Sequence, residues 1–249
     1  MSVILPAEAR IHRLVLWNID LTLLDVGRVT RAAYVDAFRE VTGRPLVQLP
    51  QQAGRTESEM FFEALELNEA APASGGDELL ARFIQALAAA FRARRGLLTE
   101  QGRLLPGAGA AVDEVGRLSG VVQTVLTGGI RPNALEKLRA FGLERFFDTG
   151  IGGYGSEVYP KGAMLLAARG RAAEKYGADF PEDATVYVAD SVRDVAAART
   201  GGARCAAVAT GRSSAGELRD AGADMVLPDL ADTAAVVRTV DRLTVPAGR

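Results

Sequence analysis

Four short, largely apolar runs recur along the chain and constrain its fold more than any other feature. Runs of this length without regular polar alternation are typical of strands buried on both faces, as in a parallel sheet. They are residues 14–17, 121–126, 185–189 and 205–209. Helical patterns, with apolar residues three and four positions apart, occupy about 107–118, 132–141, 161–176, 192–200 and 214–221. Strands that alternate with helices in this way predict an α/β fold with a doubly wound, Rossmann-like parallel sheet.

One long segment interrupts this alternation. Residues 27–105 contain no convincing strand but show three helical patterns, at about 28–42, 57–67 and 77–95. The middle pattern begins at Thr56, and Glu59 follows three residues later, which is the arrangement of a capping box. We therefore expect an α/β core made of residues 1–26 and 106–249. Residues 27–105, called the helical insert below, would follow the first strand of that core.

Charge and hydropathy argue against several classes of protein. The chain has 29 basic and 31 acidic residues, whereas a nucleic-acid-binding domain usually carries a basic excess. No stretch reaches the roughly 18 consecutive apolar residues of a membrane helix, and residues 1–10 lack the apolar run of a secretory signal. The single cysteine, Cys205, excludes an intrachain disulfide and reads as a small buried residue. We expect a cytoplasmic protein that binds neither nucleic acid nor a membrane.

Polar side chains follow three of the predicted strands, where doubly wound sheets bind their ligands. They are Asn18, Asp20 and Thr22 after the first strand, Thr127 and Gly128 after the second, and Asp190 and Asp194 after the third. Lys161, one of only three lysines, opens a later helix although a cation there opposes the helix dipole. Each residue alone could be an ordinary cap or a surface side chain. Their common position at one edge of the sheet favours a shared site.

This set of side chains suits the transfer of a phosphoryl group. The three carboxylates could hold Mg²⁺, which binds few protein carboxylates together with substrate phosphate. Thr127, the neighbouring backbone N–H groups such as that of Gly128, and Lys161 could bind the other phosphoryl oxygens and stabilise developing charge. The residues themselves leave the nucleophile unassigned.

The order Asn18-x-Asp20-x-Thr22, Thr127, Lys161 and Asp190-x-x-x-Asp194 resembles the four motifs of the haloacid dehalogenase-like (HAD) superfamily of phosphohydrolases. The helical insert resembles the helical cap of its phosphoglycolate phosphatase-like members. The resemblance implies that position 18 holds the nucleophile, which forms a phospho-aspartate, and that Asp20 is the general acid and base.

The same resemblance implies a division of roles among the remaining residues. Thr127 and Lys161 would bind the phosphoryl group, while the backbone carbonyl of Asp20 and the carboxylate of Asp190 would bind Mg²⁺. Asp194 would orient Lys161 or a water molecule on the metal. The partner implied is a small phosphorylated metabolite.

Position 18 departs from the family pattern, which begins Asp-x-Asp-x-Thr. A carboxamide is a poor nucleophile, although its oxygen can still bind a metal. Either the residue was substituted to stop turnover and trap a ligand, or the protein is a natural relative without catalysis; the otherwise complete site favours the first explanation. We expect a Mg²⁺-dependent phosphatase for a small phosphate monoester, inactivated by Asn18. A phosphomutase and a non-catalytic phosphate-ligand binding protein are the alternatives.

Two other reactions of this superfamily are disfavoured by particular residues. Relatives that act as dehalogenases lack the second aspartate of the first motif, which is Asp20 here. Cleavage of phosphonates requires a lysine in the cap, and the helical insert contains none. Within the insert, Arg55 precedes the capped helix and is the candidate for binding a carboxylate or second phosphate of the substrate. The sequence makes no prediction of the oligomeric state.

Overall fold

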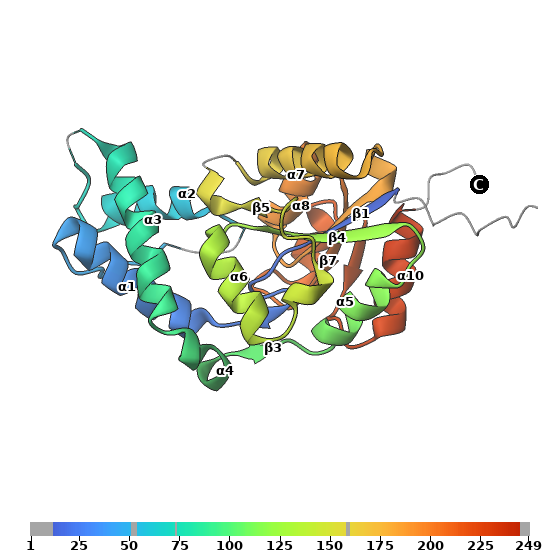
Figure 1. The fold of residues 1–249 in the computed structure, drawn as a ribbon, viewed down its shortest axis with the longest axis horizontal. Coiled ribbons are helices and arrows are strands. Elements are labelled where there is room, and N and C mark those ends of the chain that lie inside the picture. Colours follow the sequence, from blue (N-terminus) through green and yellow to red (C-terminus); the bar gives the residue numbers. More distant parts are fainter. Residues whose placement is uncertain (1–11, 51–53, 73, 158–159, 245–249) are drawn as a thin grey trace, which may run out of the picture.

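The computed structural model describes residues 12–50, 54–72, 74–157 and 160–244, and in these residues six parallel strands form the central sheet. Their order is β5-β4-β1-β6-β7-β8 (Figure 1). The strands are β1 (Arg13–Trp17), β4 (Val121–Thr127), β5 (Gly153–Tyr154), β6 (Thr185–Ala189), β7 (Arg204–Val208) and β8 (Met225–Leu227). This sheet confirms the predicted α/β fold and contains all four predicted strands.

Helices cover both faces of the sheet, because successive residues of each strand bury their side chains on opposite faces. Val15 and Trp17 of β1 belong to one apolar core, and Leu14 and Leu16 belong to another. The first core is closed by α5 (Ala108–Gly116), α6 (Arg131–Ala140) and α10 (Thr233–Thr244). The second is closed by α7 (Lys161–Tyr176), α8 (Val192–Gly201) and α9 (Ala215–Asp220). The sheet is therefore doubly wound, as the continuous apolar runs indicated.

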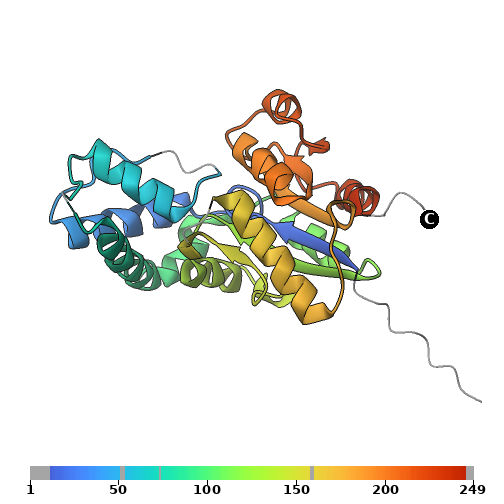
Figure 2. The ribbon, with the colours of Figure 1, turned by 90° about the horizontal axis from the view of Figure 1, so that it is seen from above.

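The helical insert lies at one end of the molecule, beside the carboxyl ends of the central strands (Figures 1 and 2). It contains α1 (Gly27–Thr42), α2 (Glu57–Leu67), α3 (Gly76–Arg92) and the short α4 (Leu98–Gln101). Aromatic rings join the three long helices, since Phe83 lies 4.9 Å from Tyr34 and 4.2 Å from Phe61 between ring centroids. The capping box of Thr56 and Glu59 is present at the start of α2, as predicted.

The expectation that residues 27–105 contain no strand is wrong. β2 (Leu24–Asp25) and β3 (Arg103–Leu104) pair antiparallel, and β3 lies inside that segment. A strand of two residues shows no periodicity in the sequence, so only its pairing reveals it. We propose that this pair forms the two connections between the helical insert and the core, residues 1–26 and 106–249.

Two expectations from composition can be compared with the structure. Cys205 lies in β7 with 2% of its surface exposed, which confirms its predicted burial. Among the described residues, no helix combines the length and the apolar character needed to cross a membrane.

Candidate active site

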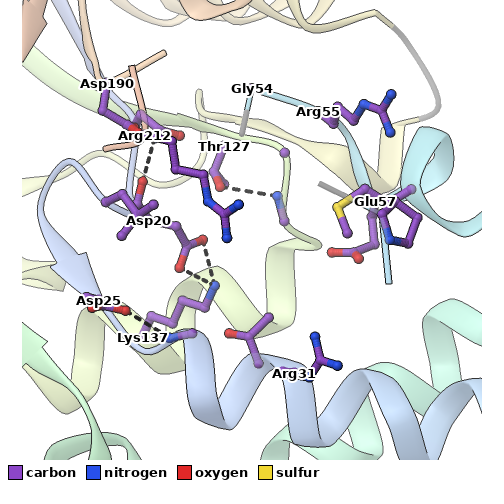
Figure 3. Close-up of a pocket in the computed structure, with 18 of the residues that line it drawn as sticks. Asp20, Asp25, Arg31, Gly54, Arg55, Glu57, Thr127, Lys137, Asp190 and Arg212 are labelled. Carbon is purple, nitrogen blue, oxygen red and sulfur yellow. Dashed lines mark hydrogen bonds and ion pairs between the residues drawn. The ribbon is translucent and has the colours of Figure 1, made fainter. Parts of the chain in front are cut away.

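Most of the predicted polar residues, though not Thr22 or Asp194, line one pocket between the carboxyl edge of the sheet and the helical insert (Figure 3). The volume of this central pocket is about 370 Å³. Its walls include the predicted residues Asn18, Asp20, Arg55, Thr127, Gly128, Lys161 and Asp190. Residues separated by more than 170 positions in the sequence are thus brought together, because they follow neighbouring parallel strands.

Asn18 occupies the centre of a hydrogen-bond network at the end of β1. Its Nδ2 donates to the carbonyl oxygen of Asp20 at 2.9 Å, to Thr22 Oγ1 at 3.1 Å and to Asp190 Oδ1 at 2.9 Å. Its Oδ1 accepts a hydrogen bond from Lys161 Nζ at 3.3 Å. The side chain is buried, and its amide is satisfied on both sides. Asn18 therefore links the four predicted motif positions that surround it.

Lys161 is held by Asp194, which lies behind it and does not line the central pocket. Lys161 Nζ lies 2.6 Å from Asp194 Oδ1, and Ser191 Oγ donates to Asp194 Oδ2 at 2.6 Å. Asp194 is fully buried, and the hydroxyl of Tyr187 also donates to it at 3.1 Å. The pair offsets the unfavourable position of a cation at the start of α7. This geometry suits the role of Asp194 in orienting Lys161.

Asp190 is a buried carboxylate of the pocket, with 3% of its surface exposed. Its Oδ1 accepts hydrogen bonds from Asn18 and Thr22, both at 2.9 Å. Burial and then the charge of Asp194 raise the pKa of Asp190 from 3.8 to about 6. The backbone of Gly211 approaches so closely that a Cβ there would lie 1.9 Å from Asp190 Oδ2. Glycine at position 211 therefore leaves room for this carboxylate.

The oxygens around Asn18 fit the coordination preferences of Mg²⁺. The carbonyl oxygen of Asp20 and the carboxylate of Asp190 converge on one point, because both accept from the same nitrogen atom. Rotation of the amide of Asn18 would present Oδ1 to that point and complete a set of hard oxygen ligands. In the described ranges, no three His, Cys, Asp or Glu side chains form a group that could hold a metal ion. The site therefore fits Mg²⁺ through the carboxylate of Asp190, the carbonyl oxygen of Asp20 and the amide oxygen of Asn18.

Lys137 is a residue of this site that the sequence pattern did not identify. Its Nζ lies 2.8 Å and 2.7 Å from the two carboxylate oxygens of Asp20. The lysine comes from α6 and its side chain is 5% exposed, whereas that of Asp20 is 41% exposed. A buried lysine thus fixes the carboxylate of Asp20 at the mouth of the pocket. The sequence feature that could have pointed to Lys137 is the rarity of lysine in this chain, which has only three.

The loop after β4 contacts the helical insert closely. The backbone N–H of Glu57 donates to the carbonyl oxygen of Gly128 at 2.9 Å, and Thr127 Oγ1 accepts from the N–H of Gly129 at 3.2 Å. A Cβ at Gly128 would lie 1.7 Å from the carbonyl oxygen of Arg55. The insert is therefore docked on the loop that we expect to bind phosphate.

Two charged residues of the insert line the pocket in different ways. Arg55 forms an ion pair with Glu63 of α2, and Figure 3 shows its side chain directed away from Asp20. Glu57, which the sequence pattern did not single out, is directed into the pocket. Burial raises the pKa of Glu57 from 4.5 to about 7, although Lys137 opposes this shift.

Comparisons with known proteins show which fold this chain shares. Among solved structures, CbbY from Rhodobacter sphaeroides in complex with phosphate is 22% identical, with a TM-score of 0.65 over 91% of this chain and 99% of that one. An aspartate-to-asparagine variant of the same protein in complex with xylulose-(1,5)bisphosphate is 22% identical, with a TM-score of 0.62 over 89% and 96%. A predicted phosphatase from Clostridium acetobutylicum is 17% identical, with a TM-score of 0.66 over 93% and 99%. These identities show a shared fold.

The family is established by the sequence itself. A search of the curated proteins finds no match. The family model of the haloacid dehalogenase-like hydrolases matches residues 15–199, which include most of β1, the helical insert, β4, β6 and most of α8. Since this match spans well over half of the chain, the protein belongs to the haloacid dehalogenase-like hydrolase family.

Proposed function

We propose that this chain carries the site of a Mg²⁺-dependent phosphatase for a small phosphate monoester, and that with Asn18 it binds such an ester without hydrolysing it. The position of Asn18 carries the proposal. Its side chain lies between Lys161 on one side and Asp190 on the other, at 3.3 Å and 2.9 Å. A phosphoryl group bound beside Lys161 would face the residue at position 18.

The residues of the core supply the binding site for the phosphoryl oxygens. Thr127 Oγ1, the backbone N–H groups of the loop that follows it and Lys161 Nζ would donate to them. Mg²⁺ held by Asp190, the carbonyl of Asp20 and Asn18 Oδ1 would add positive charge that offsets the charge of the phosphate. The ion pair between Lys161 and Asp194 keeps the lysine in place while the ligand binds.

A carboxylate at position 18 would complete the reaction. One of its oxygens would attack phosphorus while the bond between phosphorus and the leaving oxygen breaks, and Asp20 would give its proton to that oxygen. Water would then attack the phosphorus of the phospho-aspartate and give its proton to Asp20, which releases phosphate and restores both residues. Lys137 holds Asp20 in place for both steps. The uncharged amide of Asn18 does not perform the attack.

The variant of CbbY with bound xylulose-(1,5)bisphosphate supports this proposal by analogy. That protein holds a phosphate ester while carrying an aspartate-to-asparagine substitution. We propose the same behaviour here, whether Asn18 is natural or introduced.

The test is the release of phosphate from p-nitrophenyl phosphate and a panel of phosphometabolites with Mg²⁺. The Asn18→Asp variant should hydrolyse at least one of them, and the Asn18 protein should hydrolyse none. The Asn18→Ala variant is the control, because it removes the amide without adding a nucleophile. An Asn18→Asp variant that binds inorganic phosphate but hydrolyses nothing would favour a non-catalytic binding protein instead.

A further inference from the structure

The backbone of Leu21 adopts a conformation that bulky residues avoid. Its φ is 59°, in the left-handed region, and the residue lies in the turn between β1 and β2. Among the described residues, Glu69 is the only other non-glycine residue with a positive φ. In this region the Cβ of an L-residue comes too close to the backbone, so the conformation persists only where surrounding contacts hold it.

Hydrogen bonds hold the peptide groups on both sides of Leu21. Its N–H donates to the carbonyl oxygen of Leu24 at 2.8 Å, and its own carbonyl oxygen accepts from Thr210 Oγ1 at 2.6 Å. The first bond is local, whereas the second joins residues that are 189 positions apart. Thr210 follows β7, so its hydroxyl group holds the turn from a separate part of the core.

The conformation of Leu21 determines where the carbonyl oxygen of Asp20 points. In a trans peptide group the C=O and the N–H point in opposite directions. Because the N–H of Leu21 is directed to Leu24, the carbonyl oxygen of Asp20 is directed the other way. There it lies 2.9 Å from Asn18 Nδ2. With the next peptide group held by Thr210, a return of Leu21 to the usual negative φ would turn this oxygen out of place.

The residues after Thr210 reach the other side of the same site. A Cβ at Gly211 would lie 1.9 Å from Asp190 Oδ2, so this stretch of backbone packs directly against the carboxylate. Arg212, the next residue, lines the central pocket (Figure 3). One short loop therefore touches the carboxylate of Asp190 and, through Thr210, the turn that carries the carbonyl oxygen of Asp20.

We propose that Thr210 is a positioning residue for the metal site. Its hydroxyl group keeps the strained turn at Leu21 in the conformation that directs the carbonyl oxygen of Asp20 toward Mg²⁺. The inference rests on the proposed function, because it assumes that this oxygen binds the cation together with Asp190. Thr210 does not line the central pocket, so it acts through the backbone of Leu21 and not by touching the ligand.

Isothermal titration with Mg²⁺ tests the inference without turnover. The titrations use the Asn18→Asp background, in which the added carboxylate strengthens the binding of the cation. Thr210→Val keeps the shape of the side chain and removes its hydroxyl group. We expect this variant to raise the dissociation constant of Mg²⁺ about two- to tenfold, which corresponds to the loss of one hydrogen bond. Thr210→Ser retains the hydroxyl group and should bind Mg²⁺ as the Asn18→Asp parent does.

Thr42→Val is the matched control for a merely structural role. The hydroxyl group of Thr42 also donates to a backbone carbonyl oxygen, that of Phe38 at 2.7 Å. Thr42 is the last residue of α1 and does not line the central pocket. Its substitution should therefore leave the dissociation constant of Mg²⁺ unchanged, whatever it does to the melting temperature.

A double-mutant cycle tests the part played by the strained turn. Leu21→Gly removes the Cβ, so the left-handed conformation becomes readily accessible at position 21. The turn then depends less on the hydrogen bond from Thr210. In the Leu21→Gly background, Thr210→Val should raise the dissociation constant of Mg²⁺ by a smaller factor than it does when leucine is present.

The outcomes distinguish the inference from the proposed function. An unchanged dissociation constant in Thr210→Val, or an equal rise in Thr42→Val, would overturn the positioning role while Mg²⁺ still binds the parent. Binding by Thr210→Ser that is as weak as that of Thr210→Val would also overturn it, because the hydroxyl group would then not be the cause. Equal factors with and without Leu21→Gly would refute the link to the strained turn. Failure of the Asn18→Asp parent to bind Mg²⁺ would overturn the proposed function itself.

Discussion

Replacing Asn18 by Asp should make the stability of the folded protein depend on Mg²⁺. The amide nitrogen of Asn18 now donates to three oxygens at 2.9–3.1 Å. In Asn18→Asp, a carboxylate oxygen takes the place of that nitrogen and faces Asp190 Oδ1 and the carbonyl of Asp20. Without a cation these oxygens repel one another, and Asn18 thus acts in the present chain as a substitute for a cation.

The magnitude follows from the hydrogen bonds that are lost. The two amide protons are shared among these three oxygens, so two bonds at about 0.5–1.5 kcal/mol each amount to about 1–3 kcal/mol, and repulsion between carboxylates adds to this loss. Lys161, 3.3 Å from the other oxygen, offsets part of it by pairing with the new charge. We expect a net destabilisation of about 2–4 kcal/mol. For a chain of this length that corresponds to a fall in melting temperature of about 4–16 °C.

Thermal melts of both proteins in EDTA and in excess Mg²⁺ provide the assay. At a metal concentration a hundred times the dissociation constant, binding stabilises the folded state by about 2.7 kcal/mol, so Mg²⁺ should restore most of the loss in Asn18→Asp. The smaller charge around Asn18 predicts a smaller effect in the present chain. Adding Asp190→Asn to the variant should abolish the metal effect. The reasoning is refuted if Asn18→Asp melts like the parent in EDTA and Mg²⁺ changes neither protein.

Three further predictions follow from buried contacts. The pKa of Glu57 is raised from 4.5 to about 7, so the folded protein loses about 3 kcal/mol of stability as the pH rises through this interval. In Glu57→Gln, melting temperatures between pH 4.5 and 8 should vary less than in the parent. A pH profile of the melting temperature that is the same in both proteins would contradict the raised pKa of Glu57. Gly128→Ala should destabilise by about 1–3 kcal/mol in urea unfolding, since its Cβ would lie 1.7 Å from a backbone oxygen of the insert, whereas Gly109→Ala, with open space around it, should not; equal effects would argue against the close contact. In the Asn18→Asp background, Lys137→Met should lower kcat about a hundredfold by releasing Asp20, and an unaltered kcat would show that the ion pair does not position this residue.

The central strands could be predicted because their continuous apolar runs indicate strands that are buried on both faces. Residues 14–17 are apolar without a break, and both of their faces are buried in the structure. β8 was missed because its three residues are only half buried at the edge of the sheet, and β5 because two residues carry no periodic pattern. Helix α10 was missed although Val236 and Val240 are four residues apart and buried. Among the strands, the prediction of the fold class therefore depended on the interior ones.

The site was predictable where strands end and unpredictable where the insert docks. Asn18 and Asp190 were found because they follow neighbouring strands, whose ends meet in any parallel sheet. The positions of Lys137 and Glu57 depend instead on how α6 and the insert pack over that edge, which the sequence pattern does not specify. The ion pair of Arg55 with Glu63 could not be predicted either, because the two residues are eight positions apart and a helix begins between them.

The chemistry proposed for position 18 is tested most directly by mass spectrometry. The Asn18→Asp variant and the Asn18 protein are incubated with p-nitrophenyl phosphate and Mg²⁺, quenched in acid and digested to peptides. The variant should carry one phosphoryl group on the aspartate at position 18, and the Asn18 protein should carry none. The turnover rate of the Asn18 protein should be lower than that of the variant by a factor of about 10³–10⁶, which corresponds to an activation barrier higher by about 4–8 kcal/mol. Turnover by the Asn18 protein at the rate of the variant, with deamidation excluded in the same spectra, would contradict the nucleophile assignment and the mechanism built on it.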